Sequence, residues 1–175
     1  MPDLAACKVL MVLPQGRFTD TELKTMQAFL ERRKITVKTA APQKKETFGL
    51  QGTRVRPDHA LPDVDASEFD AIIFVGGIGS RDLWDDAAAH RVAREAVDAG
   101  ALVCAISNAP IILARAGLLN GREATVYFSE TKLLAELGAK YTGATITVDE
   151  NIITCKGSEA VEKLALGLIK RLSEK

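Results

Sequence analysis

Three short turns carry the residues of this chain that could do chemistry. Each turn follows a run of apolar residues, and the pairs are Gln15 with Gly16, Gly76 with Gly77, and Ser107 with Asn108. Open α/β sheets bind ligands beyond the carboxyl ends of their strands, so we expect these turns to lie near one another. Ser107 stands at the apex of a strand-to-helix turn, a geometry that exposes a nucleophile and directs backbone N–H groups at a substrate oxygen.

The groups around Ser107 limit the chemistry that the turn could support. A serine hydroxyl needs an adjacent base to act as a nucleophile. His59 lies in a polar segment and His90 in an expected helix, so neither favours a Ser-His-Asp triad. Glu22 is a candidate partner, but it also stands three residues after Thr19, as in a helix capping box. Both interpretations of Glu22 remain open from the residues alone.

The glycine pair and the cysteines predict neither a dinucleotide nor a metal. Gly76 and Gly77 are explained either by a tight turn or by a backbone N–H aimed at an oxyanion or phosphate, and no G-x-G-x-x-G follows a strand. Cys7, Cys104 and Cys155 are odd in number and widely spaced. Such spacing favours reduced thiols over disulfides or C-x-x-C metal sites. We expect no metal and no cofactor.

The elements that must position these turns alternate between strand and helix. Apolar runs and turn residues predict strands over 8–13, 36–41, 71–75, 102–106 and 124–128, and a hairpin over 145–155. Helical spacing predicts helices after residue 19 and over 87–99, 111–116, 130–137 and 161–172. This alternation predicts a three-layer α/β sandwich with a mostly parallel sheet. Residues 43–70 form an ordered excursion, and no linker divides 1–175, so we expect one domain.

Composition favours a small-molecule partner. The 175 residues carry 23 Lys and Arg against 23 Asp and Glu, so no basic field favours nucleic acid or an anionic membrane. Hydrophobic residues make up 47% of the chain, yet no apolar run approaches the roughly 20 residues of a membrane span. The N-terminus lacks the basic region of a signal peptide, so we expect a cytoplasmic protein.

Five segments together resemble the ThiJ/PfpI (DJ-one-like) superfamily. They are FTDTEL, FVGGIG, CAISNAP, GLLNGREATVYFS and ENIITCKG. The resemblance extends over nearly the whole chain, and the segments stand in the family's order and spacing. The resemblance implies a flavodoxin-like fold of the class I glutamine amidotransferase-like type, with a nucleophile elbow.

The resemblance also implies roles for individual residues. The family's elbow usually has the pattern A-I-C-x-G-P, in which the cysteine is the nucleophile, often followed by a histidine, and a glutamate near the first helix bonds the thiol. Glu22 matches that glutamate, whereas Ser107, Asn108 and Ala109 stand at the cysteine, histidine and glycine positions. The implied catalytic residues are Ser107, Glu22 and Asn108, the implied oxyanion site uses the backbone of Gly77 and Asn108, and the implied pocket includes Gly76, Gln15 and Tyr127.

Serine at the elbow predicts weak activity. A cysteine titrates near pKa 8.5 and is easily activated, whereas a carboxylate with an ordinary pKa near 4 is a poor base for a serine hydroxyl. Ser107 is explained either as an engineered Cys→Ser replacement or as a natural variant, and the family elements retained around the elbow favour the first. We expect the chain to be nearly inactive toward carbonyl substrates.

Two function classes follow from the resemblance. The first is a cysteine-hydrolase-type enzyme acting on a small α-oxoaldehyde, as a glyoxalase or deglycase, or on an amide or peptide, as a protease. The second is a non-catalytic stress-response, redox-sensing or chaperone-like dimer that binds a small ligand at the elbow. Both predict a homodimer or larger assembly, with Arg81, Asp82 and Trp84 as candidate contact residues. Position 107 in close relatives would discriminate between the classes.

Overall fold

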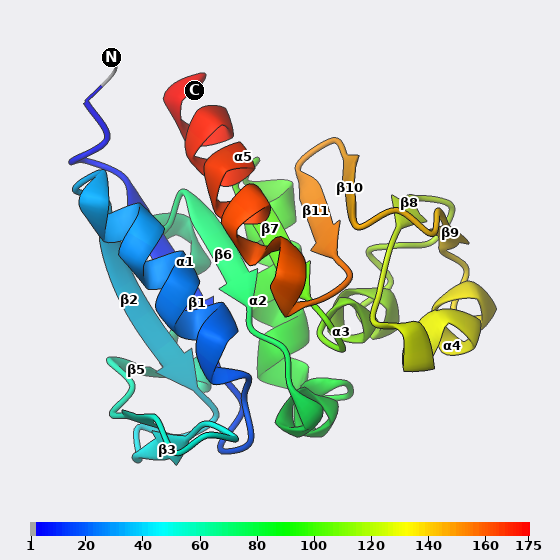
Figure 1. The fold of residues 1–175 in the computed structure, drawn as a ribbon, viewed down its shortest axis with the longest axis horizontal. Coiled ribbons are helices and arrows are strands. Elements are labelled where there is room, and N and C mark those ends of the chain that lie inside the picture. Colours follow the sequence, from blue (N-terminus) through cyan, green and yellow to red (C-terminus); the bar gives the residue numbers. More distant parts are fainter. Residues whose placement is uncertain (1–2) are drawn as a thin grey trace.

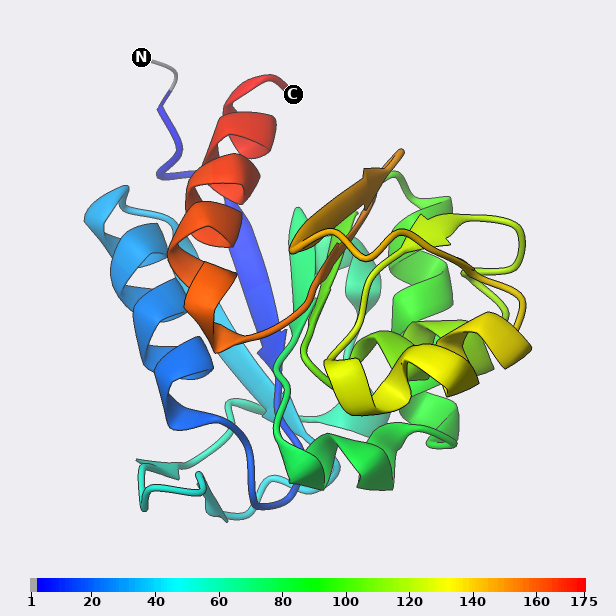
Figure 2. The ribbon, with the colours of Figure 1, turned by 45° about the vertical axis from the view of Figure 1, so that its right-hand side comes forward.

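A computed structural model describes residues 3–175, which form three layers around one large sheet (Figure 1). The seven strands of that sheet are β1 (Lys8–Val12), β2 (Thr36–Ala41), β5 (His59–Ala60), β6 (Ala71–Phe74), β7 (Leu102–Ile106), β10 (Ile146–Asp149) and β11 (Ile152–Cys155). The α-helices are α1 (Asp20–Arg32), α2 (Ala87–Asp98), α3 (Pro110–Arg115), α4 (Thr131–Glu136) and α5 (Val161–Ser173). Figure 2 shows α1 and α5 on one side of the sheet and the other three helices on the opposite side.

The large sheet is parallel except at one edge. Its order is β10-β11-β7-β6-β1-β2-β5, and only β10 runs antiparallel to its neighbour. The central strands are buried on both faces, as expected for continuous apolar runs. The predicted three-layer α/β fold with a mostly parallel sheet is confirmed. Because the strands are parallel, the turns after β1, β6 and β7 share one edge of the sheet.

Alternating side chains of each strand supply two separate cores. In β1, Val9 and Met11 pack toward α1 and α5, whereas Leu10 and Val12 pack toward α2 and α3. Burial of both faces explains why the strand sequences lack polar alternation. The sheet therefore gives the turns at its carboxyl edge a rigid base.

The prediction of a strand over 124–128 is wrong for most of its length. Only β8 (Glu123–Ala124) forms, and it pairs with β9 (Lys140–Tyr141) outside the large sheet. The chain then turns, because Thr125 N donates to Thr154 Oγ1 and Tyr127 N donates to the carbonyl oxygen of Ser107. These bonds draw Tyr127 toward the elbow, and a 3₁₀ helix, η4 (Phe128–Glu130), follows.

Residues 43–70 form the expected ordered excursion. They contain a small hairpin of β3 (Thr47–Phe48) and β4 (Arg54–Val55), then β5 at the sheet edge, and the 3₁₀ helices η1 (Leu61–Asp63) and η2 (Ala66–Glu68). The other 3₁₀ helices of the described chain are η3 (Ile78–Leu83) and η5 (Ser158–Ala160).

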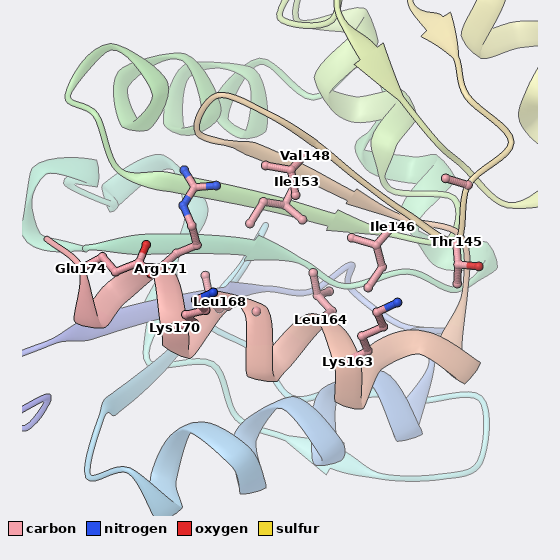
Figure 3. Close-up of a pocket in the computed structure, with 12 residues that line it drawn as sticks. Thr145, Ile146, Val148, Ile153, Lys163, Leu164, Leu168, Lys170, Arg171 and Glu174 are labelled. Atoms are coloured by element: carbon pink, nitrogen blue, oxygen red, sulfur yellow. The ribbon is translucent and has the colours of Figure 1, made fainter. Parts of the chain in front are cut away.

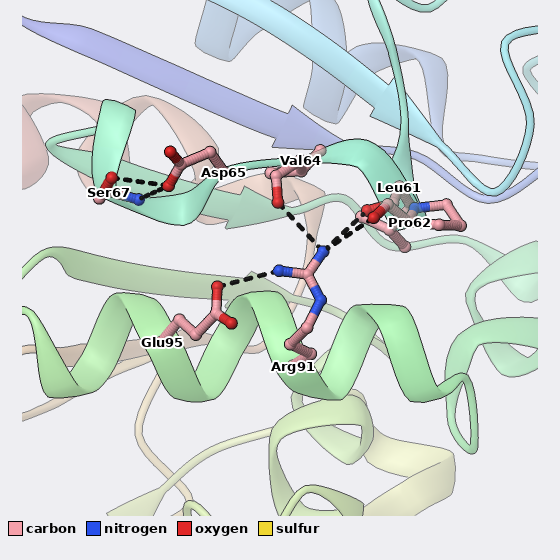
Figure 4. Close-up of polar contacts among 7 residues, drawn as sticks. All are labelled: Leu61, Pro62, Val64, Asp65, Ser67, Arg91 and Glu95. Carbon is pink, nitrogen blue, oxygen red and sulfur yellow. Dashed lines mark hydrogen bonds and ion pairs between the residues drawn. The ribbon is translucent and has the colours of Figure 1, made fainter.

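Side chains from two helices hold this excursion in place. Buried Asp20 accepts hydrogen bonds from the N–H groups of Gln51 and Thr53, at 2.8 and 2.9 Å. On α2, the Arg91 guanidinium donates to three backbone carbonyls of the segment that follows β5 (Figure 4). The same guanidinium pairs with Glu95 at 2.9 Å.

Within residues 3–175, no helix is both long enough and apolar enough to cross a bilayer.

Candidate functional site

Ser107 occupies a strained turn directly after β7. Its φ is 58°, in the left-handed region that side-chain-bearing residues rarely adopt. The turn is fixed on both sides, since Ser107 N donates to the carbonyl oxygen of Cys155 and α3 starts at Pro110. Gly76 supports it from the turn after β6, where an added Cβ would lie 2.6 Å from the Ser107 Cβ. The structure thus places Ser107 in the elbow geometry that the sequence predicted.

Glu22 lies beside Ser107 and does not complete a capping box. Its Oε1 accepts a hydrogen bond from Ser107 Oγ at 2.5 Å, and its side chain is fully buried. Thr19 is the N-cap of α1 but its side chain makes no capping bond, and its N–H donates to the carbonyl oxygen of Gly76. Because that N–H is occupied, the capping-box interpretation is wrong, and Glu22 is turned toward the elbow.

Burial changes the acid–base character of Glu22. Desolvation raises the pKa of Glu22 to about 7, although hydrogen bonds from Ser107, from the Thr19 side chain and from the Gly76 backbone act in the opposite direction. Its second oxygen, Oε2, is buried and has no hydrogen-bond partner among residues 3–175. The expectation of an ordinary carboxylate with a pKa near 4 is therefore wrong. At neutral pH the group is poised to accept or to donate a proton.

A cavity of about 370 Å³ opens in front of the elbow. Ser107, Asn108, Gly77 and Tyr127 line it, together with Thr19, Leu50, Ile78, Arg81, Ser129, Ser158 and Glu159. Glu22 and Gly76 are not in the lining, and they stand behind Ser107. The prediction of Gly76 as a pocket residue is therefore wrong. A ligand in this cavity would therefore meet Ser107 directly and Glu22 only through it.

Gln15 is not part of this cavity, so the prediction of Gln15 as a pocket residue is wrong. Its side-chain amide donates to the carbonyl oxygen of Lys45 at 2.9 Å and accepts from Gln43 N at 2.8 Å. Gln15 therefore ties the loop after β1 to the start of the excursion. Its position after a buried strand was correct, but the side chain faces the neighbouring loop.

Two backbone N–H groups in the cavity lining are available to an oxyanion. Neither Gly77 N nor Asn108 N donates a hydrogen bond to any acceptor within the described chain. Gly77 has φ 109°, and an added Cβ would lie 2.6 Å from the Arg17 carbonyl oxygen and 2.7 Å from Thr19 N. Only glycine fits this position. Since unpaired N–H groups are costly away from water, these two are suited to bind a negatively charged oxygen.

The side chain of Asn108 belongs to a network that sequence reasoning missed. Its Nδ2 donates to Glu130 Oε1 at 3.1 Å, and Arg81 Nη2 contacts the same oxygen at 2.6 Å. Trp84 Nε1 donates to the Asn108 carbonyl oxygen at 3.1 Å. Arg81 and Trp84, candidates for a subunit contact, thus make contacts within their own chain that orient Asn108. No spacing in the sequence links Glu130 to the elbow.

The two histidines contact other parts of the described chain. His90 Nε2 contacts the Trp84 carbonyl oxygen at 2.7 Å, and the His59 ring packs edge-on against Phe69. Neither histidine lines the cavity. Across residues 3–175, no three His, Cys, Asp or Glu side chains lie together as metal ligands would.

In fold and site, the chain is an α/β protein with a nucleophile elbow at the carboxyl edge of a parallel sheet. It belongs to the DJ-1/PfpI family, whose model matches residues 7–171. The resemblance to the ThiJ/PfpI superfamily, with its flavodoxin-like fold, is confirmed.

Three similar proteins illustrate this relationship. The uncharacterized protein MJ0967 of Methanocaldococcus jannaschii is 33% identical over 170 residues, covering 95% of this chain and 83% of the relative. The glutathione-independent glyoxalase DJR-1.2 of Caenorhabditis elegans is 28% identical, covering 93% of this chain and 87% of the relative. The crystal structure of a ThiJ/PfpI domain protein from Brachyspira murdochii matches with a TM-score of 0.92 and 26% identity, covering 96% and 97% of the two chains.

Proposed function

We propose that this chain binds small carbonyl compounds, α-oxoaldehydes above all, and attacks them slowly through Ser107. The observation that carries the proposal is the arrangement of Ser107 Oγ, bonded to Glu22 at 2.5 Å, beside the free N–H groups of Gly77 and Asn108. A relative named as a glyoxalase supports this substrate class. Amides and peptides are the second substrate class that the family resemblance implies.

The proposed first step is addition of the Ser107 hydroxyl to the substrate carbonyl. Ser107 Oγ forms a bond to the carbonyl carbon, its proton passes to Glu22 Oε1, and the carbonyl π electrons move to the oxygen. The N–H groups of Gly77 and Asn108 hold that oxyanion. Because Glu22 stands behind Ser107, the oxyanion takes a proton from solvent water and Glu22 releases its own to solvent. The product is a neutral hemiacetal, so the addition is balanced without any redox partner.

Serine makes this step slow even though the pKa of Glu22 is raised. A carboxylate with a pKa of about 7 is a better base than an ordinary one, yet an alcohol remains far less acidic than a thiol. In this proposal Ser107 stands where the family's cysteine nucleophile belongs. An engineered Cys→Ser change and a natural serine predict the same behaviour.

The test is turnover of methylglyoxal by the chain and by a Ser107→Cys variant. We expect the thiol to raise turnover a hundredfold or more, about 3 kcal/mol of barrier. The matched control is Ser107→Ala, which removes the nucleophile and keeps the cavity. Equal turnover by the chain and both variants, whether high or absent, would remove the elbow from the reaction and favour the binding-only alternative.

A non-catalytic, self-associating role is the second candidate, and exposed apolar side chains around the cavity favour it. Leu50, Ile78 and Tyr127 line the cavity and are 55%, 45% and 38% exposed, and neighbouring Phe128 is 67% exposed. Apolar groups gathered in this way commonly mark an interaction surface. A homodimer covering the cavity mouth would bury them, and a ligand could then be held at the elbow without turnover.

A further inference from the structure

A second hollow, of about 520 Å³, lies between α5 and the β10-β11 hairpin (Figure 3). It shares no residue with the elbow cavity. Its central part is apolar, with Ile146, Ile153, Leu164 and Leu168 facing one another across the gap. We call this hollow the α5 groove. Its size falls in the range of sites that bind small molecules.

Gly167 leaves open space on the α5 side of the groove. It lies in the interior of α5, where glycine lowers helix stability relative to other residues. An added Cβ at Gly167 would meet nothing within 4 Å, and the backbone φ angle of Gly167 is not positive. Neither packing nor backbone conformation within this chain therefore calls for glycine. The missing side chain does create space in the groove.

Basic side chains stand toward both ends of the α5 groove. Lys163 lies beside Ile146 at one end, and Lys170 and Arg171 lie toward the other (Figure 3). Within the described chain, Lys163 and Lys170 form no ion pair, and Arg171 Nη2 donates to the Glu150 carbonyl oxygen at 2.8 Å. Glu174 is the one acidic residue of the lining. The groove is therefore cationic in a chain whose formal net charge is zero.

We propose that the α5 groove binds a medium-chain aliphatic carboxylate. The apolar centre would hold the alkyl chain, and Lys170 with Arg171, or Lys163, would pair with the carboxylate. Lys163 and Arg171 are eight residues apart on α5, about 12 Å along the helix, which suits an extended chain of roughly ten carbons. The site is independent of the chemistry proposed at the elbow.

The test is calorimetric titration of the full chain with sodium decanoate below its micelle concentration. We expect one site with a dissociation constant on the order of 100 μM or tighter. Decanol, which lacks the charge, should bind at least tenfold more weakly. Gly167→Leu adds a side chain to the lining and should weaken decanoate binding at least tenfold. Leu166→Ala, at an exposed neighbour outside the groove, should leave the binding within twofold.

A second variant keeps the test independent of how well Gly167→Leu folds. Lys170→Glu reverses a charge on an exposed helical position and should weaken decanoate binding several-fold, while Ser107→Ala at the elbow should leave it unchanged. Absence of binding at millimolar decanoate would overturn the proposal, as would equal binding of decanol or no effect of either groove variant. If Gly167→Leu instead changes the mass in light scattering and decanoate does not bind, a second copy of the chain occupies the groove.

Discussion

Titration of Glu22 should make the stability of this protein fall between mildly acidic and neutral pH. The perturbation that isolates this effect is Glu22→Gln, which keeps the shape of the side chain and an oxygen that can accept from Ser107 Oγ. Glutamine does not titrate. We therefore take the difference between the free energies of unfolding of the two proteins. The change of this difference with pH is the contribution of Glu22.

The expected size follows from the raised pKa. Burial raises the pKa of Glu22 from 4.5 to about 7, and each unit corresponds to about 1.4 kcal/mol. Below pH 4.5 the carboxyl is protonated in both the folded and the unfolded chain, so it carries no penalty. Between pH 4.5 and 7 the unfolded chain releases the proton and the folded chain retains it, which lowers the free energy of unfolding. The loss is complete above the folded pKa and amounts to about 3 kcal/mol.

Urea unfolding followed by circular dichroism, at intervals from pH 4 to 8, measures this difference. The free energy of unfolding of the unmodified chain, minus that of Glu22→Gln, should decrease by about 3 kcal/mol over that range. Glu159→Gln is a matched variant, because the negative charge of Glu159 helps to raise the pKa of Glu22, and it should reduce the decrease without abolishing it. A difference that stays constant with pH, or that increases, would refute a buried Glu22 of raised pKa.

Three further predictions concern the network, the thiols and assembly. Glu130→Ala should lower the free energy of unfolding by about 3 kcal/mol in urea titrations, because the Asn108 amide and the Arg81 guanidinium lose their shared acceptor. A change below about 0.5 kcal/mol would show that the network does not stabilise the fold. Burial raises the pKa of Cys104 to about 12 and that of Cys155 to about 11. Mass spectrometry should therefore find both thiols unmodified after iodoacetamide treatment of the folded protein at pH 8. Rapid labelling of either thiol would contradict their burial. Light scattering at micromolar concentration should give at least the mass of a homodimer, and a strictly monomeric mass would contradict self-association.

The sequence predicted the sheet well because its central strands are buried on both faces. The run at 102–106 matches β7 at both ends, since its apolar residues stop where the chain leaves the core. The segment 36–41 also matches β2 at both ends, although only its last three residues are buried and its end is marked by Pro42. The run at 124–128 misled for the opposite reason. Its apolar side chains Ala124 and Val126 are buried against the helices on one face of the sheet. Only Ala124, the last residue of β8, pairs with another strand. Burial and strand pairing are separate properties that periodicity does not distinguish.

The candidate site was predictable only in part. Position and glycine content placed Ser107 and Gly77 at the sheet edge, but the pairing of Ser107 with Glu22 joins residues 85 positions apart and was implied by the family resemblance. The raised pKa of Glu22 depends on burial by the folded chain, which local sequence does not report. For the same reason, the bond between Glu130 and Asn108 had no counterpart in spacing.

The central claim is that the elbow at position 107 activates a nucleophile. The alkylation rate of the thiol in a Ser107→Cys variant tests this claim most directly. Iodoacetamide labelling at pH 6.5, followed by peptide mass spectrometry, compares the introduced thiol with partly exposed Cys7, whose pKa is raised by burial. We predict labelling at position 107 at least tenfold faster than at Cys7, because protonated Glu22 and the free N–H groups of Gly77 and Asn108 stabilise a thiolate there. Labelling at position 107 that is no faster than at Cys7 would contradict the account.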